Sequence, residues 1–209
     1  MNKAKVSVSI LTIAYLSISF IATFGVIIYE VINNRGYFNI WPVINYLGSL
    51  IPFVLILLYC FAFCNNHIGK TILIALLSYK AASFLGSFAR LFGNFTQYLK
   101  NGALGQFIKV YFDDLIIDLG GIAVFTLLIL YLLRVTRSKT ALTVISFSYF
   151  IFTFILREIS IFQSFSSILR PSVDAYTIYF IVSTFVNLIG FGLSLAIWLI
   201  FTKSEILKD

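Results

Sequence analysis

Charged residues are scarce in this 209-residue chain: Asp, Glu, Lys and Arg together make up 11% of it. A soluble domain usually contains about 25% of such residues, because its surface must remain in contact with water. Apolar residues make up 60% of the chain, so too few polar side chains remain to cover a soluble domain of this length. The same composition excludes a disordered chain, which is poor in apolar and aromatic residues. The class that remains is an integral membrane protein.

Histidine and cysteine are almost missing as well. His67 is the single histidine, and Cys60 and Cys64 are the two cysteines. These three residues have a helical spacing, but a structural zinc site needs a fourth ligand, and cysteine is often a small buried hydrophobic residue. We therefore expect no metal and no cofactor. The usual motifs of membrane-associated hydrolases, Gly-x-Ser-x-Gly and His-Glu-x-x-His, are not found, which favours a non-enzymatic role.

Long apolar stretches dominate the chain. A helix needs about 20 mainly apolar residues to cross a bilayer, where each backbone polar group must be paired within the segment. Six stretches have this length: residues 6–29, 43–64, 71–92, 115–133, 141–162 and 176–201. The longest connection, residues 93–114, is too short to bury a core, and we expect a short interfacial or re-entrant helix at residues 103–112. The sequence predicts an all-α, polytopic membrane helix bundle that forms a single transmembrane domain over residues 1–209.

The Lys and Arg residues of the loops predict the orientation of the bundle. With six crossings both termini lie on one side of the membrane. That side collects Lys3, Lys5, Lys70, Arg134, Arg137, Lys139, Lys203 and Lys208, whereas the opposite loops collect Arg35, Lys100, Lys109 and Arg170. Since cytoplasmic loops are enriched in Lys and Arg, we expect both termini in the cytoplasm and the protein in the cell membrane. Anionic lipid accounts for the net charge of +7, so no nucleic-acid partner is expected.

Ionisable side chains within the apolar stretches are the strongest leads to function, because a charge in hydrocarbon costs several kcal/mol. Four polar residues of the third stretch share an arc of about 80° on a helix: Lys80, Ser83, Ser87 and Arg90. The fourth stretch begins with Asp113 and Asp114 and also carries Asp118. From the expected depths of these residues we predict an ion pair between Lys80 and Asp118 and another between Arg90 and Asp114.

Three further polar residues complete the predicted site. Arg157 and Glu158 lie at the outer end of the fifth stretch, and Asn187 lies near the middle of the sixth. The sequence predicts a polar cavity, open to the outer side, that binds a small polar or charged solute. Its lining residues are Lys80, Ser83, Ser87, Arg90, Asp114, Asp118, Arg157, Glu158 and Asn187. The protein would then be a carrier or the substrate-binding membrane subunit of a transporter.

A second interpretation assigns these charges to structural ion pairs. Ser78, Ala82 and Gly86 recur every four residues beside the polar arc, a spacing that lets another membrane helix approach closely. The protein would then be a non-catalytic sensor or interaction subunit with other membrane subunits as partners. A carrier predicts a wet cavity that reaches Lys80 and Asp118, whereas a docking subunit predicts paired charges and an exposed small-residue face. A third interpretation, a lipid-modifying enzyme that uses Asp114 and Asp118, lacks a recognisable motif.

Overall fold

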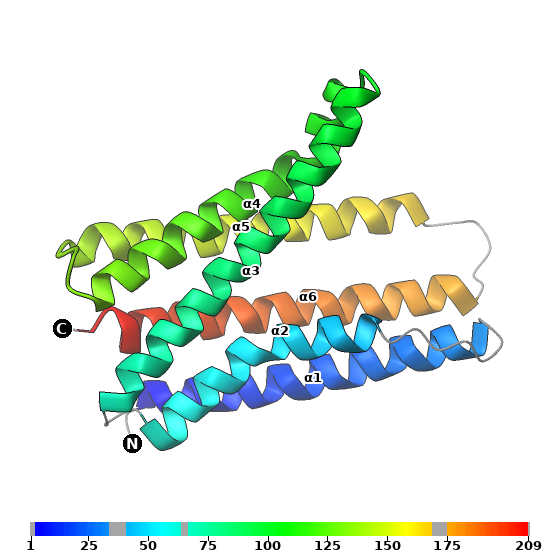
Figure 1. Ribbon diagram of the computed structural model, residues 1–209. Coiled ribbons are helices and arrows are strands. Elements are labelled where there is room, and N and C mark those ends of the chain that lie inside the picture. The colour runs from blue at the N-terminus through cyan, green and yellow to red at the C-terminus, as the bar shows by residue number, and fades with distance from the viewer. Residues whose placement is uncertain (1–2, 34–40, 64–66, 169–174, 209) are drawn as a thin grey trace. The chain divides into compact units, whose positions relative to one another are not determined.

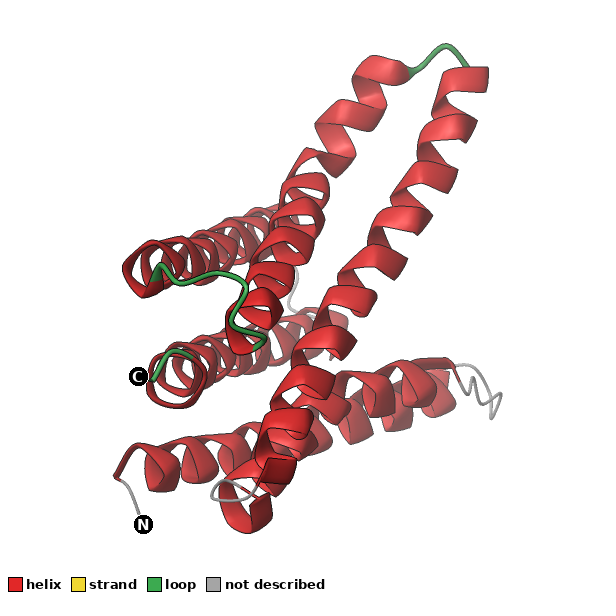
Figure 2. Ribbon diagram, turned by 60° about the vertical axis from the view of Figure 1, so that its left-hand side comes forward, coloured by secondary structure: helices red, strands yellow, loops and turns green. Residues whose placement is uncertain are grey.

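The computed structural model describes residues 3–33, 41–63, 67–168 and 175–208, and over these ranges the protein is helical with no strand (Figure 2). The α-helices are α1 (Lys3–Asn33), α2 (Trp41–Leu58), α3 (His67–Lys100), α4 (Leu104–Leu132), α5 (Lys139–Ile168) and α6 (Ala175–Phe201) (Figure 1). Two π-helical turns extend α2 and α6, namely η1 (Tyr59–Phe63) and η2 (Thr202–Ile206). The predicted all-α class is confirmed.

Five segments of these helices are long and apolar enough to cross a membrane: Lys3–Gly25, His67–Lys100, Leu104–Leu132, Lys139–Gln163 and Ile181–Ile206. The crossing expected at residues 43–64 corresponds to a shorter apolar helix, Tyr46–Ala62. The helix itself is longer, because α2 with 18 residues continues into η1 with 5 residues, and about 20 residues are needed to cross a typical hydrocarbon core. The helices are those of an integral membrane protein, while the count of six and the cytoplasmic termini stay predictions. Arg35 and Arg170, which support the orientation, lie outside the described residues.

The chain divides into two compact units. Unit 1 consists of Met1–Ala62 and Phe154–Glu205, and unit 2 consists of Phe63–Thr153 and Ile206–Asp209. Unit 1 therefore contains α1, α2, α6 and the second half of α5. Unit 2 contains α3, α4 and the first half of α5.

In unit 2, α3 and α4 form an antiparallel hairpin with a turn of three residues, 101–103 (Figure 1). Gly102 has φ of 66°, a left-handed conformation that glycine adopts without steric cost. The amide of Ala103 donates to the carbonyl of Tyr98 over 3.0 Å and closes the turn. The predicted long connection at residues 93–114 is therefore wrong, and residues 103–112 are not a separate re-entrant helix, since residues 104–112 belong to α4. Hydropathy falls near Arg90, but the sequence from there to Lys100 contains no proline to end the helix.

Aromatic rings join α3 and α4 beside this turn. The ring of Phe107 lies 5.3 Å from that of Phe95 and 5.7 Å from that of Tyr98, between centroids. Tyr111 adds a contact of 6.0 Å with Tyr98. Aromatic pairs at these separations stabilise a contact beyond their buried area. The rings therefore hold the hairpin together past the ends of the two predicted apolar stretches.

Farther from the turn, glycines bring α4 close to aromatic side chains of α3 and α5. A Cβ added at Gly121 would lie 2.6 Å from a ring carbon of Phe84 and 2.7 Å from the hydroxyl oxygen of Tyr149. That hydroxyl donates a hydrogen bond to the carbonyl of Ile117 over 2.9 Å. Phe125, one turn further along α4, is buried and stacks with Phe84. The close packing of Phe84 and Tyr149 on α4 therefore requires glycine at position 121.

The core of unit 1 lies where α1 packs against α2 and α6. Tyr15 of α1 and Phe53 of α2 have ring centroids 4.1 Å apart. Val8 and Ile197 are fully buried on α1 and α6. Thr12 is also buried, and its hydroxyl donates to the carbonyl of Val8 over 2.7 Å. A buried threonine in this arrangement satisfies its polar group within its own helix.

Candidate functional site

Six of the nine predicted site residues belong to unit 2. On α3, Lys80 and Ser87 are half-buried, whereas Ser83 and Arg90 are exposed. The hydroxyl of Ser83 donates to the carbonyl of Lys80 over 2.8 Å, so it is used within its own helix. On α4, Asp114 is exposed, whereas Asp118 is only 4% exposed. Asp118 is therefore the most deeply buried of the predicted residues of this unit.

The packing of the hairpin defines which residues of α3 and α4 lie at the same level. The close approach of Phe84 to Gly121 sets those two residues level with each other, and the contact of Tyr98 with Phe107 gives the same register. Counting from these contacts, Asp118 is level with Ser87. Lys80 lies seven residues before Ser87 on α3, which is about 10 Å at 1.5 Å per residue. A lysine side chain spans about 6 Å, so Ser87 is closer in level to Asp118 than Lys80 is.

The same register sets Arg90 and Asp114 within one residue of the same level. Both are exposed, and their predicted ion pair stays a prediction. The ion pair predicted between Lys80 and Asp118 also stays a prediction.

The other three predicted residues belong to unit 1. The guanidinium carbon of Arg157 lies 5.2 Å from the ring centroid of Phe191, a geometry typical of a cation–π interaction. Glu158 is half-buried, and its Oε1 atom is buried without a hydrogen-bond partner among the described residues. Asn187 is exposed. Within unit 1, the contact of Arg157 with Phe191 joins α5 to α6.

The small-residue face of α3 is open. Ser78, Ala82 and Gly86 are all exposed, and a Cβ added at Gly86 would meet no atom within 4 Å. This is the exposed face that the second interpretation predicts.

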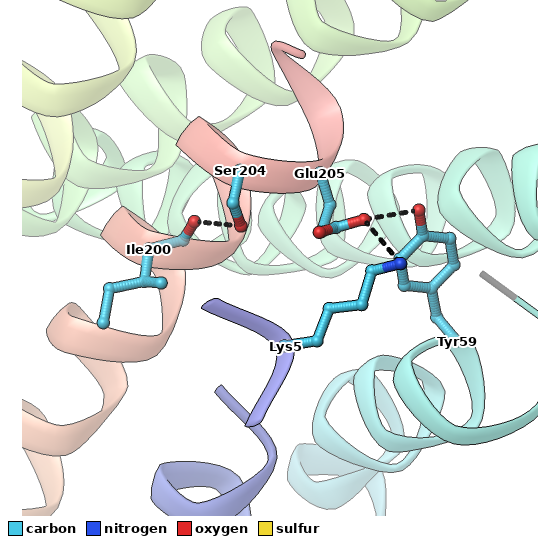
Figure 3. A network of polar contacts seen from close by, with 5 residues as sticks. All are labelled: Lys5, Tyr59, Ile200, Ser204 and Glu205. Carbon is cyan, nitrogen blue, oxygen red and sulfur yellow. Dashed lines mark hydrogen bonds and ion pairs between the residues drawn. The ribbon is translucent and has the colours of Figure 1, made fainter. Parts of the chain in front are cut away.

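The structure also brings together three residues that the sequence interpretation did not connect, which we name the Lys5–Tyr59–Glu205 cluster (Figure 3). Tyr59 Oη donates a hydrogen bond to Glu205 Oε2 over 2.9 Å. Lys5 Nζ lies 3.8 Å from the same oxygen. Tyr59 and Glu205 are each only 2% exposed, and the side chain of Lys5 is 11% exposed. The cluster is therefore a buried, charged contact among α1, η1 and η2.

Local structure explains why this cluster was missed. Lys5 lies in the first turns of α1, and we counted it as a terminal positive charge. Tyr59 and Glu205 are 146 residues apart, so no local pattern links them. The one available signal was Glu205 itself, an acidic residue between Lys203 and Lys208 at the end of an apolar stretch.

No group of three metal-ligating side chains occurs among the residues that the structure describes. Cys60 is a buried free cysteine, and Cys64 lies outside the described ranges. Because Cys64 is not described, the expectation that Cys60, Cys64 and His67 hold no metal stays a prediction.

Comparisons of the chain with models of protein families, with curated proteins and with solved structures give no match.

Proposed function

We propose that the protein is a small-solute carrier, or the substrate-binding membrane subunit of one, with its recognition site on the α3–α4 hairpin around Asp118. The observation that carries this proposal is the burial of the Asp118 carboxyl group in the middle of an apolar helix. A carboxyl group in a membrane-spanning helix is costly, and such groups usually mark solute, ion or proton pathways. This support does not depend on unit 1.

The chemistry of the neighbouring residues defines the class of solute. The carboxylate of Asp118 would bind an amino group or another hydrogen-bond donor of the solute, and the Ser87 hydroxyl at the same level can donate or accept. Lys80, which lies farther from the hairpin turn than Ser87, would bind an anionic group. Asp114 and Arg90 lie nearer the turn of the hairpin, where exposed charges would attract a polar solute. A small molecule that carries both an amino and an acidic group fits these residues best.

Thermal unfolding of the purified protein in detergent tests this proposal. The panel contains amino acids, short peptides, sugars, nucleosides and inorganic ions. We expect one solute class to raise the Tm of the wild type and Asp118→Asn to abolish that rise. Asp113→Asn is the matched control, because Asp113 is exposed on the same helix, and it retains the rise. An unchanged Tm with every solute, or an equal response of Asp118→Asn and wild type, contradicts the proposal.

The exposed face of Ser78, Ala82 and Gly86 favours a second candidate function, that of a non-catalytic membrane subunit whose α3 packs against a helix of another protein. A photocrosslinking residue at position 82 tests it in native membranes. We expect a specific larger product that Gly86→Leu removes, because a bulky side chain blocks close helix approach. Gly105→Leu is the control, since Gly105 is equally open, and it leaves the product intact. No product, or equal loss in both variants, contradicts this candidate.

A further inference from the structure

The two hydrogen-bonding partners of the Lys5–Tyr59–Glu205 cluster both lie in π-helical turns. Tyr59 is the first residue of η1, and Glu205 belongs to η2. Such turns are rare in proteins and occur frequently at functional sites. In the described part of the chain each π-turn ends an apolar helix, and a buried hydrogen bond joins the two turns.

Each π-turn also lies at the end of one of the two stretches of chain that make up unit 1. Unit 1 ends at Ala62, within η1, and again at Glu205, within η2.

A π-turn accommodates one residue more than the α-helical turn that it replaces, since its hydrogen bonds span five residues instead of four. If a π-turn relaxes to an α-helix, the residues beyond it shift by one helical position, which is about 100° of rotation and about 1.5 Å of rise. The hydrogen bond from Tyr59 to the Glu205 carboxylate is charge-assisted and buried. Lys5 supplies the positive charge that compensates the carboxylate.

We propose that the Lys5–Tyr59–Glu205 cluster is a conformational latch. While the Tyr59–Glu205 hydrogen bond is made, both π-turns are held; when it is broken, η1 and η2 relax to α-helix together. The latch lies within unit 1 and is separate from the proposed solute site around Asp118.

Hydrogen exchange of the full-length protein in nanodiscs, read by mass spectrometry, tests the latch. The informative peptides cover residues 56–66 and 199–209, and a peptide from α4 serves as the internal reference. We expect Tyr59→Phe to change exchange at η2 as well as at η1, and Glu205→Gln to change exchange at η1 as well as at η2. This reciprocity distinguishes a latch from two independent helix ends. Lys5→Gln removes only the ion pair, and we expect a smaller change at the same two sites.

Ser204→Ala is the matched control. Ser204 lies in η2 next to Glu205, but its hydroxyl donates to the carbonyl of Ile200 in the preceding turn (Figure 3), so we expect no effect at η1. Changes confined to the mutated turn, or a uniform increase that includes α4, would overturn the latch.

A ¹⁹F label at Phe61, an exposed residue of η1, gives a second readout, the number of ¹⁹F resonances. A contact with a purely structural role would not change this number. We expect one resonance in the wild type and a second resonance, from the relaxed turn, in Glu205→Gln. A single resonance in both proteins at the same position contradicts the proposal.

Discussion

At the scale of single residues, Gly121 is the position where side-chain size matters most in unit 2. It is enclosed by the ring of Phe84 and the hydroxyl of Tyr149, and that hydroxyl also holds the carbonyl of Ile117. Any side chain at Gly121 must displace one of these groups. The glycine therefore sets the distance between α4 and the helices that pack on it.

We predict that Gly121→Ala lowers the free energy of unfolding by about 1–3 kcal/mol, the usual cost of overpacking a filled core. Thermal unfolding in detergent measures the effect. Gly105→Ala is the control, because a Cβ at Gly105 meets nothing within 4 Å, and alanine is the better helix former. Its Tm should equal or exceed that of the wild type. Equal losses in the two variants would show that the close approach at Gly121 is not limiting.

Single residues also show which features of the candidate site could be predicted from the sequence and which could not. A charge in an apolar stretch is visible in the sequence, and this is how Asp118 was selected; the structure adds that its side chain is buried, while its role in a solute site stays a prediction. The sequence does not show which hydrogen bonds a helical side chain makes, and it did not predict that the hydroxyl of Ser83 donates to the carbonyl of Lys80 in its own helix. The sequence was also blind to Glu205, whose burial results from contacts with α1 and η1 that are made only in the folded chain.

At the scale of helices, the contact of Arg157 with Phe191 ties α5 to α6 within unit 1. Sequence analysis placed Arg157 in the solute site, whereas the geometry gives its guanidinium a partner on the neighbouring helix. An exposed cation–π contact contributes about 0.5–1 kcal/mol.

We therefore predict a coupling free energy of about 0.5–1 kcal/mol between Arg157→Gln and Phe191→Leu in a double-mutant cycle of unfolding. Neither substitution should alter the solute-dependent rise in Tm. If Arg157→Gln abolishes that rise while the coupling is zero, Arg157 belongs to the solute site instead of the helix contact.

The ends of α3 and α4 illustrate why helix boundaries were harder to predict than helices. The positions of the apolar stretches were enough to locate the helices, because each stretch must satisfy its own backbone in lipid. Hydropathy, however, reports the extent of the hydrocarbon and not the end of the helix. Between Arg90 and Asp114 the polar residues suggested a loop, while the rings of Tyr98 and Phe107 pack two continuing helices together.

At the scale of the whole molecule, the number of crossings decides on which side the termini lie. Within the described residues, five helical segments have the length of a membrane crossing, and the apolar segment Tyr46–Ala62 is shorter. If α2 also crosses, the N- and C-termini share a side; if it does not, they lie on opposite sides. With six crossings, the excess of Lys and Arg on the side of the termini favours a cytoplasmic location of both termini.

We predict that reporters fused before Lys3 and after Lys208 both indicate the cytoplasm. A reporter that fluoresces only in the cytoplasm, and an enzyme reporter that is active only outside, give opposite readouts for each terminus. A reporter inserted at Gly102, in the turn between α3 and α4, should give the outer readout. Opposite results for the two termini would leave α2 on one side of the bilayer and reverse part of the assigned sidedness.

The length of the α3–α4 hairpin has a practical consequence. At 34 and 29 residues, these helices are about 50 and 44 Å long, whereas the hydrocarbon is about 30 Å thick. We therefore expect their shared turn, braced by aromatic rings, to project past the lipid. A rigid epitope grafted at Gly102 would stand clear of the micelle and recruit an antibody fragment. The bound fragment would add enough mass to align images of this 23.6 kDa protein in electron cryomicroscopy, for which the protein alone is too small.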